Sequence, residues 1–262
     1  MEFITSDGIA LNYHDQGTGQ AVVLVAGFGG YQEIWKLQVE YLLAMNCRVI
    51  TFDHRNHGQS QKTTQGLTIQ RLTIDLAELI SYLQLTKPIL IGHSMGASVC
   101  YSYLSHYQNV KAVMAIDQSP KMLNDPQWSY GFEDITLDNF VEKTSKPNGV
   151  HETLHGLDNR VAFELNAMRS QFPFDREENL PLLFDHIKCD WRKTLLETAV
   201  PVSLVVAQQS PYFDCKFADE ISENNPQVSK VVLDNCGHDI MAEIPEVFDQ
   251  TLRHFIFSSL RK

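Results

Sequence analysis

One five-residue motif constrains the fold of this chain more than any other part of its sequence. Gly92-His93-Ser94-Met95-Gly96 stands between an apolar run at residues 88–91 and a helix-like segment at residues 97–107. Gly-x-Ser-x-Gly between a strand and a helix is typical of a sharp turn that raises a serine hydroxyl above the end of a parallel sheet. The glycines fit this turn because its strained backbone leaves room only for small side chains beside the serine. The motif therefore predicts an α/β sheet and a nucleophilic Ser94.

Apolar runs of strand length alternate with segments of helical periodicity along most of the chain. We expect strands at residues 3–5, 11–14, 21–25, 48–52, 88–91, 110–116, 201–206 and 228–233, and helices at about 33–45, 67–83, 97–107 and 246–259. The first two strands flank the hairpin turn Asp7-Gly8, so they should be antiparallel. The alternation that follows predicts a parallel arrangement for the rest. The expected fold is a mostly parallel, eight-stranded α/β sheet.

The alternation stops after Pro120 and resumes near residue 199. Between these points no strand-like run occurs, and helix-like pieces alternate with turns. We therefore predict a core of residues 1–120 and 199–262, with residues 121–198 inserted as a helical cap over the strand ends. The aromatic residues of the insertion either line an apolar cavity or belong to an ordinary core; they are Trp128, Tyr130, Phe132, Phe163 and Trp191.

Charge and cysteine content restrict the partners and the compartment. The chain has 262 residues, a net charge of −11 and no cluster of Lys and Arg, which argues against a nucleic-acid partner. Its five scattered cysteines suit free thiols in a reducing compartment. The N-terminus has no signal-peptide pattern, and the apolar runs are too short to span a bilayer. We expect a cytoplasmic enzyme with a small-molecule substrate; its oligomeric state, monomer or dimer, stays open.

His238 is the expected general base for Ser94. It follows the last predicted strand, and functional groups gather at the carboxyl ends of strands in such sheets. A neutral imidazole can take the serine proton and return it to a leaving group. His93 is the rival candidate, but its position next to Ser94 in the turn should direct it away from the hydroxyl, so we interpret it as a packing residue.

Two backbone N–H groups are expected to stabilise the negative charge that develops on the substrate. Such an oxyanion hole usually takes one donor from the residue after the nucleophile, here Met95. The other should come from the glycine-rich loop Gly27-Phe28-Gly29-Gly30, which follows the strand at residues 21–25. Phe28 is the expected donor.

The acid that orients the base does not occupy the position after the strand at residues 201–206. Ser210 occurs there, and Asp214 lies four residues farther along the loop. Asp117, by contrast, ends the preceding strand, where its carboxylate can accept a hydrogen bond from the imidazole Nδ1. We predict that Asp117 is the acid and that Ser210 is its neutral hydrogen-bonding companion.

These motifs resemble those of the α/β-hydrolase superfamily along essentially the whole chain. The segment from Asp53 to Ser60 is similar to that superfamily's D-x-R-G-x-G-x-S loop, with Asn56 in place of a glycine. Asp117 together with Ser210 resembles the YbfF-type esterases, in which the acid has moved to the end of the sixth strand. The resemblance implies that Ser94, His238, Asp117 and Ser210 act together on esters or thioesters.

The predicted function is that of a serine hydrolase that forms an acyl-enzyme, with no metal or organic cofactor. Two alternatives remain. The same scaffold could support C–C hydrolysis or cofactor-free dioxygenation of a heteroaromatic ring, without an acyl-enzyme. A ligand-binding protein without turnover is the other. The motifs do not predict the acyl chain length or the leaving group.

Overall fold

A single eight-stranded sheet organises the protein, for which a computed structural model describes residues 1–146 and 149–261. The strand order is β1-β2-β4-β3-β5-β6-β7-β8. Their bounds are β1 Glu2–Ile4, β2 Ala10–Gly17, β3 Gln20–Val25, β4 Cys47–Phe52, β5 Ile89–His93, β6 Ala112–Ile116, β7 Val202–Ala207 and β8 Val228–Leu233. All eight predicted strands are present.

The pairing is mostly parallel, as predicted. β1 and β2 form an antiparallel hairpin, and β2 pairs antiparallel with β4. The remaining neighbours, from β4 through β3 and β5 to β8, are all parallel. Strands β3, β5, β6 and β7 are almost continuously apolar because both of their faces are covered. The carboxyl ends of β5, β6 and β8 therefore meet at one edge of the sheet.

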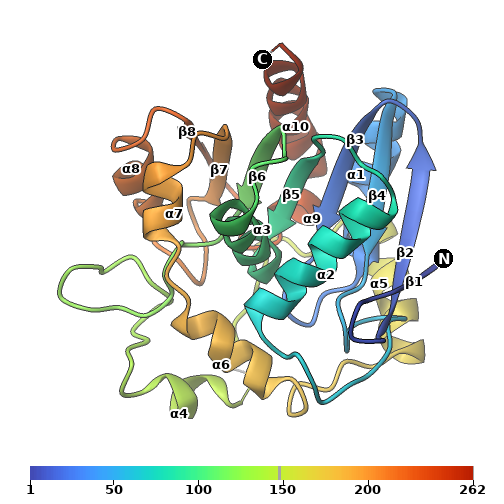
Figure 1. The fold of residues 1–262 in the computed structure, drawn as a ribbon. Helices are drawn as coiled ribbons and strands as arrows, with labels where there is room; N and C mark the ends of the chain where they lie inside the picture. Colours follow the sequence, from blue (N-terminus) through green and yellow to red (C-terminus); the bar gives the residue numbers. More distant parts are fainter. Residues whose placement is uncertain (147–148, 262) are drawn as a thin grey trace.

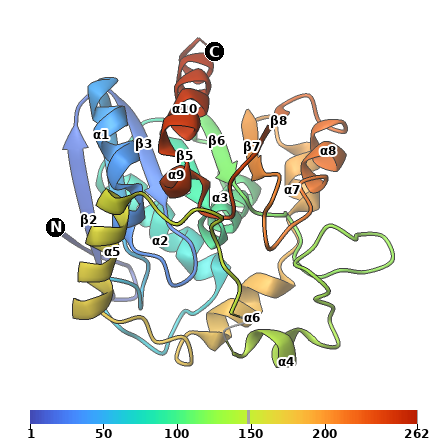
Figure 2. The same cartoon turned by 180° about the vertical axis from the view of Figure 1, so that it is seen from behind.

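Helices cover both faces of the sheet and create two hydrophobic cores. Figure 1 shows α2 and α3 in front of the strands, and Figure 2 shows α1, α9 and α10 in front of the opposite face. The helices of the sheet region are η1 Gln32–Trp35, α1 Lys36–Ala44, α2 Ile69–Tyr82, α3 Met95–His106, α8 Phe217–Ser222, α9 Ile240–Glu243 and α10 Pro245–Leu260. In α2, buried Leu72, Leu76 and Leu79 form the inner face, and the Thr68 hydroxyl caps the N-terminus.

The segment between β6 and β7 forms helices and, among its described residues, two isolated β-bridges that join Lys121 with Asp190 and Asp125 with Trp128. Its helices are α4 Phe140–Thr144, α5 Asn159–Gln171, α6 Leu180–Lys188 and α7 Arg192–Glu197. They do not share one core of their own: Val161 and Leu165 of α5 join one sheet core, whereas Leu182 of α6 and Leu195 of α7 join the other. Both views place α4 and α6 together beyond one end of the sheet (Figures 1 and 2).

Two short helices, α8 and α9, were not predicted. They have six and four residues, so neither is long enough for an apolar periodicity to be recognised. α3 begins at Met95, two residues earlier than expected, because the turn at Ser94 leads directly into the helix. The predicted helix at 33–45 is a 3₁₀ turn followed by α1.

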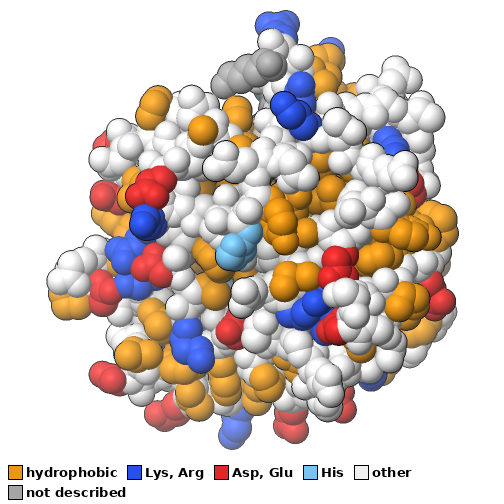
Figure 3. Space-filling model, in the orientation of Figure 1, with side chains coloured by type: hydrophobic (Ala, Val, Ile, Leu, Met, Phe, Trp, Pro, Cys, Tyr) orange, Lys and Arg blue, Asp and Glu red, His pale blue; other side chains and the backbone are white. Residues whose placement is uncertain are grey.

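The surface and the helix lengths bear on possible partners. Acidic and basic side chains lie intermingled on the face drawn in Figure 3. Within residues 1–146 and 149–261, no helix combines the length and apolar character needed to cross a membrane. All five cysteines are free; three are buried and two are partly buried.

Candidate active site

Ser94 lies in a strained turn between β5 and α3. Its backbone has φ 54° and ψ −126°, a conformation that L-residues rarely adopt. The turn is compressed on both sides: a Cβ on Gly92 would lie 2.4 Å from the Gly96 carbonyl oxygen, and one on Gly96 would lie 2.2 Å from the Val25 carbonyl oxygen. The two glycines of the motif are therefore required by space, and the turn directs the Ser94 side chain out of the sheet core.

His238 and Asp117 form a hydrogen bond at the carboxyl edge of the sheet. The distance from His238 Nδ1 to Asp117 Oδ2 is 2.7 Å, and both side chains are buried. Asp117 follows β6 and His238 follows β8, and these are the two strands that flank β7. The Ala207 N–H, at the end of β7, donates to Asp117 Oδ1 at 3.1 Å. The carboxylate is thus held from the strand that lies between the two residues.

Ser210 completes the surroundings of the carboxylate. Its hydroxyl donates to Asp117 Oδ2 at 2.6 Å, so one carboxylate oxygen accepts hydrogen bonds from both Ser210 and His238. The Ser210 oxygen also accepts from the N–H groups of Tyr212 and Phe213, each at 3.3 Å. The structure therefore brings Asp117, Ser210 and His238 together as the sequence reasoning expected.

The charges around His238 favour its protonated form. Burial lowers the pKa of the imidazole, but the hydrogen bond and charge of Asp117, with the charges of Asp239 and Glu152, outweigh burial and raise it above 6.5. The Tyr212 ring lies edge-on to the imidazole, with centroids 4.7 Å apart. An imidazolium formed by taking up a proton would thus be stabilised at this position.

Ser94 and His238 line a common cavity of about 80 Å³. Within the part of the chain that the structure describes, neither Ser94 Oγ nor His238 Nε2 has a hydrogen-bond partner. Catalytic hydrogen bonds are often long or poorly aligned before substrate binds, so the lack of a hydrogen bond between Ser94 and His238 is compatible with proton transfer in a complex. Ser94 also lines a second cavity of about 130 Å³.

The glycine-rich loop runs beside Ser94. A Cβ on Gly27 would lie 3.5 Å from Ser94 Oγ, which shows how closely the loop backbone approaches the hydroxyl. The Gly29 N–H donates to His57 Nε2 at 3.0 Å and is therefore not available to a substrate. By contrast, the N–H groups of Phe28 and Met95 donate to no group among the described residues. These are the two donors that the sequence reasoning chose.

His57 is a supporting residue that sequence reasoning did not identify. Its Nδ1 lies 2.8 Å from the Arg55 carbonyl oxygen, so Nδ1 carries the proton and Nε2 is free to accept from Gly29. Complete burial lowers its pKa to about 4, which keeps the ring neutral. Its place in the Asp53–Ser60 loop was the available signal. Asn56 of that loop has φ 65°, which asparagine adopts more readily than most residues.

His93 does more than the packing role predicted for it. It is buried, with its Nε2 3.0 Å from the His238 carbonyl oxygen, and its ring centroid lies 4.5 Å from that of His238. Burial, followed by the charge of His238, lowers its pKa well below 6.5. A neutral His93 can therefore donate from Nε2 to the backbone of His238 and position it.

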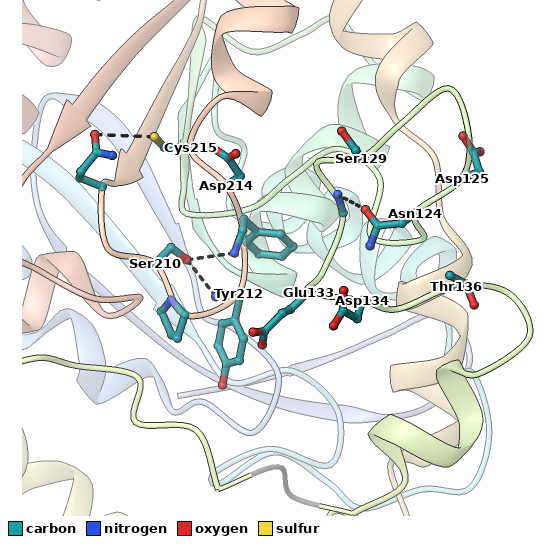
Figure 4. Close-up of a pocket in the computed structure, with 14 residues that line it drawn as sticks. Asn124, Asp125, Ser129, Glu133, Asp134, Thr136, Ser210, Tyr212, Asp214 and Cys215 are labelled. Atoms are coloured by element: carbon teal, nitrogen blue, oxygen red, sulfur yellow. Dashed lines mark hydrogen bonds between the residues drawn. The ribbon is translucent and has the colours of Figure 1, made fainter.

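Asp214 lines a groove and neither of the two cavities that Ser94 lines. A groove lies on the outer side of the loop after β7, lined by Asp214, Ser210 and Tyr212 on one side and by the segment at residues 124–136 on the other (Figure 4). Asp214 Oδ1 accepts a hydrogen bond from the Lys216 N–H at 3.0 Å, a local turn contact.

The 130 Å³ cavity beside Ser94 is lined by apolar and by polar or charged side chains in nearly equal number. Its apolar lining includes Met122, Phe132, Leu183, Ile187 and Phe213. Of the aromatic residues that were considered for such a cavity, Phe132 lines it; Trp128 is buried in the core, and Phe163 is 73% exposed. Among the described residues, no group of three or more His, Cys, Asp or Glu side chains is arranged to hold a metal ion.

Comparison with known proteins assigns the family. The sequence model for the alpha/beta hydrolase fold matches residues 20–245, most of the chain. The chain belongs to the α/β-hydrolase family. Among curated α/β-hydrolases, it is 23% identical to the AB hydrolase superfamily protein YisY of Bacillus subtilis, over 96% of this chain and 97% of that protein. It is 28% identical to a non-heme haloperoxidase of Rhodococcus erythropolis, over 54% of this chain and 53% of that protein.

Solved structures of other proteins share the whole fold. The esterase EaEST from Exiguobacterium antarcticum has a TM-score of 0.86 and 22% identity, with 98% of each chain covered. A bromoperoxidase from Bacillus anthracis has a TM-score of 0.84 and 22% identity, covering 98% of this chain and 99% of that one. At this identity the likeness shows the fold alone. The chain is thus an α/β-hydrolase enzyme, and the resemblance to YbfF-type esterases stays a prediction.

Proposed function

We propose that this α/β-hydrolase cleaves carboxylic esters or thioesters through an acyl-enzyme. Ser94 attacks the acyl carbonyl, and its proton passes to His238 Nε2. Asp117, supported by Ser210, holds the imidazole and stabilises the imidazolium. The N–H groups of Phe28 and Met95 stabilise the oxyanion. His238 then protonates the leaving group, water attacks the acyl-enzyme, and the acid is released.

The observation that supports this most is the position of His238 relative to its partners. Nδ1 is 2.7 Å from Asp117, which leaves Nε2 as the proton acceptor, and His238 lines the same cavity as Ser94. A base with one nitrogen fixed by a carboxylate and the other open beside a strained serine is the arrangement that acyl transfer requires.

The two cavities beside Ser94 suggest where the acyl group and the leaving group of a substrate bind. We assign the acyl group to the 130 Å³ cavity, because that cavity is the larger of the two and has more apolar side chains in its lining. An engineered cavity of roughly 150 Å³ holds benzene, so the acyl group should be short, about four to six heavy atoms. The leaving group and water then use the smaller, more polar cavity, which His93 and Asp239 line with His238. In this proposal residues 121–198 form the cap that closes the acyl side.

Labelling by a fluorophosphonate probe tests the nucleophile. The wild-type protein should be labelled, and Ser94→Ala should not. Ser98→Ala is the matched control, because Ser98 lies one turn farther along α3 and bonds His186. Labelling that persists in Ser94→Ala would contradict the proposal.

Burst kinetics with 4-nitrophenyl butyrate test the acyl-enzyme. A covalent intermediate that breaks down slowly gives an initial burst of product. C–C hydrolysis or cofactor-free dioxygenation does not require acylation of Ser94. Probe labelling without ester turnover would favour one of these alternatives, and a protein inert to probe and substrate would favour a ligand-binding role.

A further inference from the structure

The 130 Å³ cavity, assigned above to the acyl group, contains an arginine that has no acidic partner among the described residues. Arg176 lines the cavity together with Ser94, and its Nη2 donates to the Thr144 carbonyl oxygen at 2.7 Å. Its Nε is buried and has no hydrogen-bond partner in the structure. A guanidinium has five N–H donors and stays charged in proteins, so most of its binding capacity is unused.

This arginine differs from the others that are removed from solvent. The remaining buried or partly buried arginines are each paired with an aspartate; they are Arg48 with Asp15, Arg55 and Arg71 with Asp75, and Arg192 with Asp190. Burial lowers the pKa of Arg176 below the usual value of a guanidinium. An unpaired, partly desolvated guanidinium in a cavity is a natural site for an anion.

The charge of the whole cavity agrees with this interpretation. Lys143 and Lys146 also line it, and neither forms an ion pair among the described residues. Of the described residues that line the cavity, Glu152 is the one carboxylate, and its Oε1 accepts from the Tyr212 hydroxyl at 2.6 Å. The cavity therefore has three cations and one anion, in a chain whose net charge is −11.

Arg176 also lies close to Phe28 of the glycine-rich loop. Its Cζ is 5.5 Å from the centroid of the Phe28 ring, and the Phe28 N–H is one of the two free donors beside Ser94. An acyl group bound at Ser94 that extends into this cavity would therefore pass Phe28 and bring its far end to the guanidinium. The volume of about 130 Å³ limits the distance between the two ends to a few carbon atoms.

We propose that Arg176 binds a carboxylate at the far end of the acyl group, so that the substrate is an ester or thioester of a short dicarboxylic acid. This inference rests on the acyl-enzyme function proposed above. The guanidinium accepts the carboxylate through paired N–H groups, and Lys143 and Lys146 attract the anion to the cavity. The charge of Glu152 disfavours a second anionic group near His238.

Paired thioesters of N-acetylcysteamine test this specificity. The succinyl thioester has the terminal carboxylate, and the pentanoyl thioester is its neutral counterpart of similar length. Thiol release is followed, with the uncatalysed rate subtracted. In the wild type, kcat/KM should be higher for the succinyl compound. Arg176→Gln should lower that value by about ten- to a hundredfold and leave the pentanoyl value within about twofold.

Arg253→Gln is the matched control. Arg253 is exposed on α10 and is not among the residues that line the cavity, and its substitution by glutamine removes the same charge. It should change neither value. A wild-type preference for the pentanoyl compound, or an equal loss for both compounds in Arg176→Gln, would overturn the assignment of Arg176.

A binding measurement separates this inference from the catalytic proposal. Monomethyl succinate and methyl pentanoate are titrated calorimetrically into Ser94→Ala, which needs no turnover; the first carries one terminal carboxylate and the second is neutral. We expect monomethyl succinate to bind at least about tenfold more tightly, and this preference to disappear in Ser94→Ala/Arg176→Gln. If neither thioester is hydrolysed but the preference for monomethyl succinate holds, the acyl-enzyme proposal fails and the anion site stands. Equal binding of the two esters would overturn the anion site.

Discussion

Replacing Asp117 by asparagine should disable the base without removing any atom from its surroundings. Three donors face the carboxylate: His238 Nδ1–H and the Ser210 hydroxyl at Oδ2, and the Ala207 N–H at Oδ1. Asparagine keeps one acceptor oxygen and places an NH₂ group where the other oxygen was. The orientation of the amide therefore decides the outcome.

The three partners differ in their ability to adapt. The Ala207 N–H can only donate, so an NH₂ group facing it would leave two buried donors opposed, at about 1–3 kcal/mol each. The Ser210 hydroxyl can rotate to accept, and His238 can move its proton from Nδ1 to Nε2. The amide should therefore turn its NH₂ group toward His238. The imidazole then carries its proton on Nε2 and cannot take the proton of Ser94.

The expected loss in kcat is about 10³- to 10⁴-fold, equivalent to about 4–5.5 kcal/mol, as found when the corresponding aspartate of a serine protease becomes asparagine. Ser210→Ala should cost about tenfold or less, because it removes one hydrogen bond to a charged group and leaves the tautomer unchanged. Both are measured with 4-nitrophenyl butyrate, with urea denaturation to confirm that each variant is folded.

Asp214→Asn is the control, because Asp214 lies on the same loop and bonds only within its own turn. It should retain wild-type kcat within about twofold. A larger loss in Asp214→Asn than in Asp117→Asn would refute the assignment of the acid. A kcat for Asp117→Asn within tenfold of the wild-type value would also refute it, because an imidazole with its proton on Nε2 cannot accept the proton of Ser94.

Three further predictions concern the same region. Gly96→Ala should abolish the native fold or cost more than about 4 kcal/mol in urea denaturation, because its Cβ would overlap the Val25 carbonyl oxygen, which lies in the sheet backbone; a loss below about 1 kcal/mol would contradict the steric argument. The pH profile of kcat/KM should rise through an acid limb above pH 6.5, because the pKa of His238 is raised and the base must be neutral; a limb below that pH would contradict the charge arrangement. For His57 the pKa is lowered from 6.5 to about 4, so its contribution to stability is complete above pH 6.5 and is lost as the pH falls toward 4. The unfolding free energy should therefore fall between pH 7 and pH 5 by about 2 kcal/mol more in the wild type than in His57→Phe, and equal falls would contradict the assigned protonation state.

The parts of this protein that were predictable depend on neighbours in the sequence. The strands were recognised because β3, β5, β6 and β7 are buried on both faces and read as unbroken apolar runs. Ser94, Asp117 and His238 could be proposed because each follows such a run, and parallel strands end at one edge. The family assignment and the eight-stranded sheet were confirmed, whereas the role of each residue stays a prediction until it is tested.

The parts that escaped prediction depend on contacts between distant segments. His57 could not be singled out among ten histidines, because its role depends on the N–H of Gly29, 28 residues away. In the sequence, Arg176 resembles any charged residue of a helical insertion. Among the described residues it differs from the other buried or partly buried arginines because each of those forms an ion pair with an aspartate and Arg176 does not. The spacing of residues along the sequence does not reveal which arginine lacks an ion-pair partner in the fold. In the proposed function, the catalytic residues stand at the ends of strands, whereas the substrate preference depends on Arg176 in the insertion between β6 and β7. Catalysis and substrate preference should therefore respond independently to substitution.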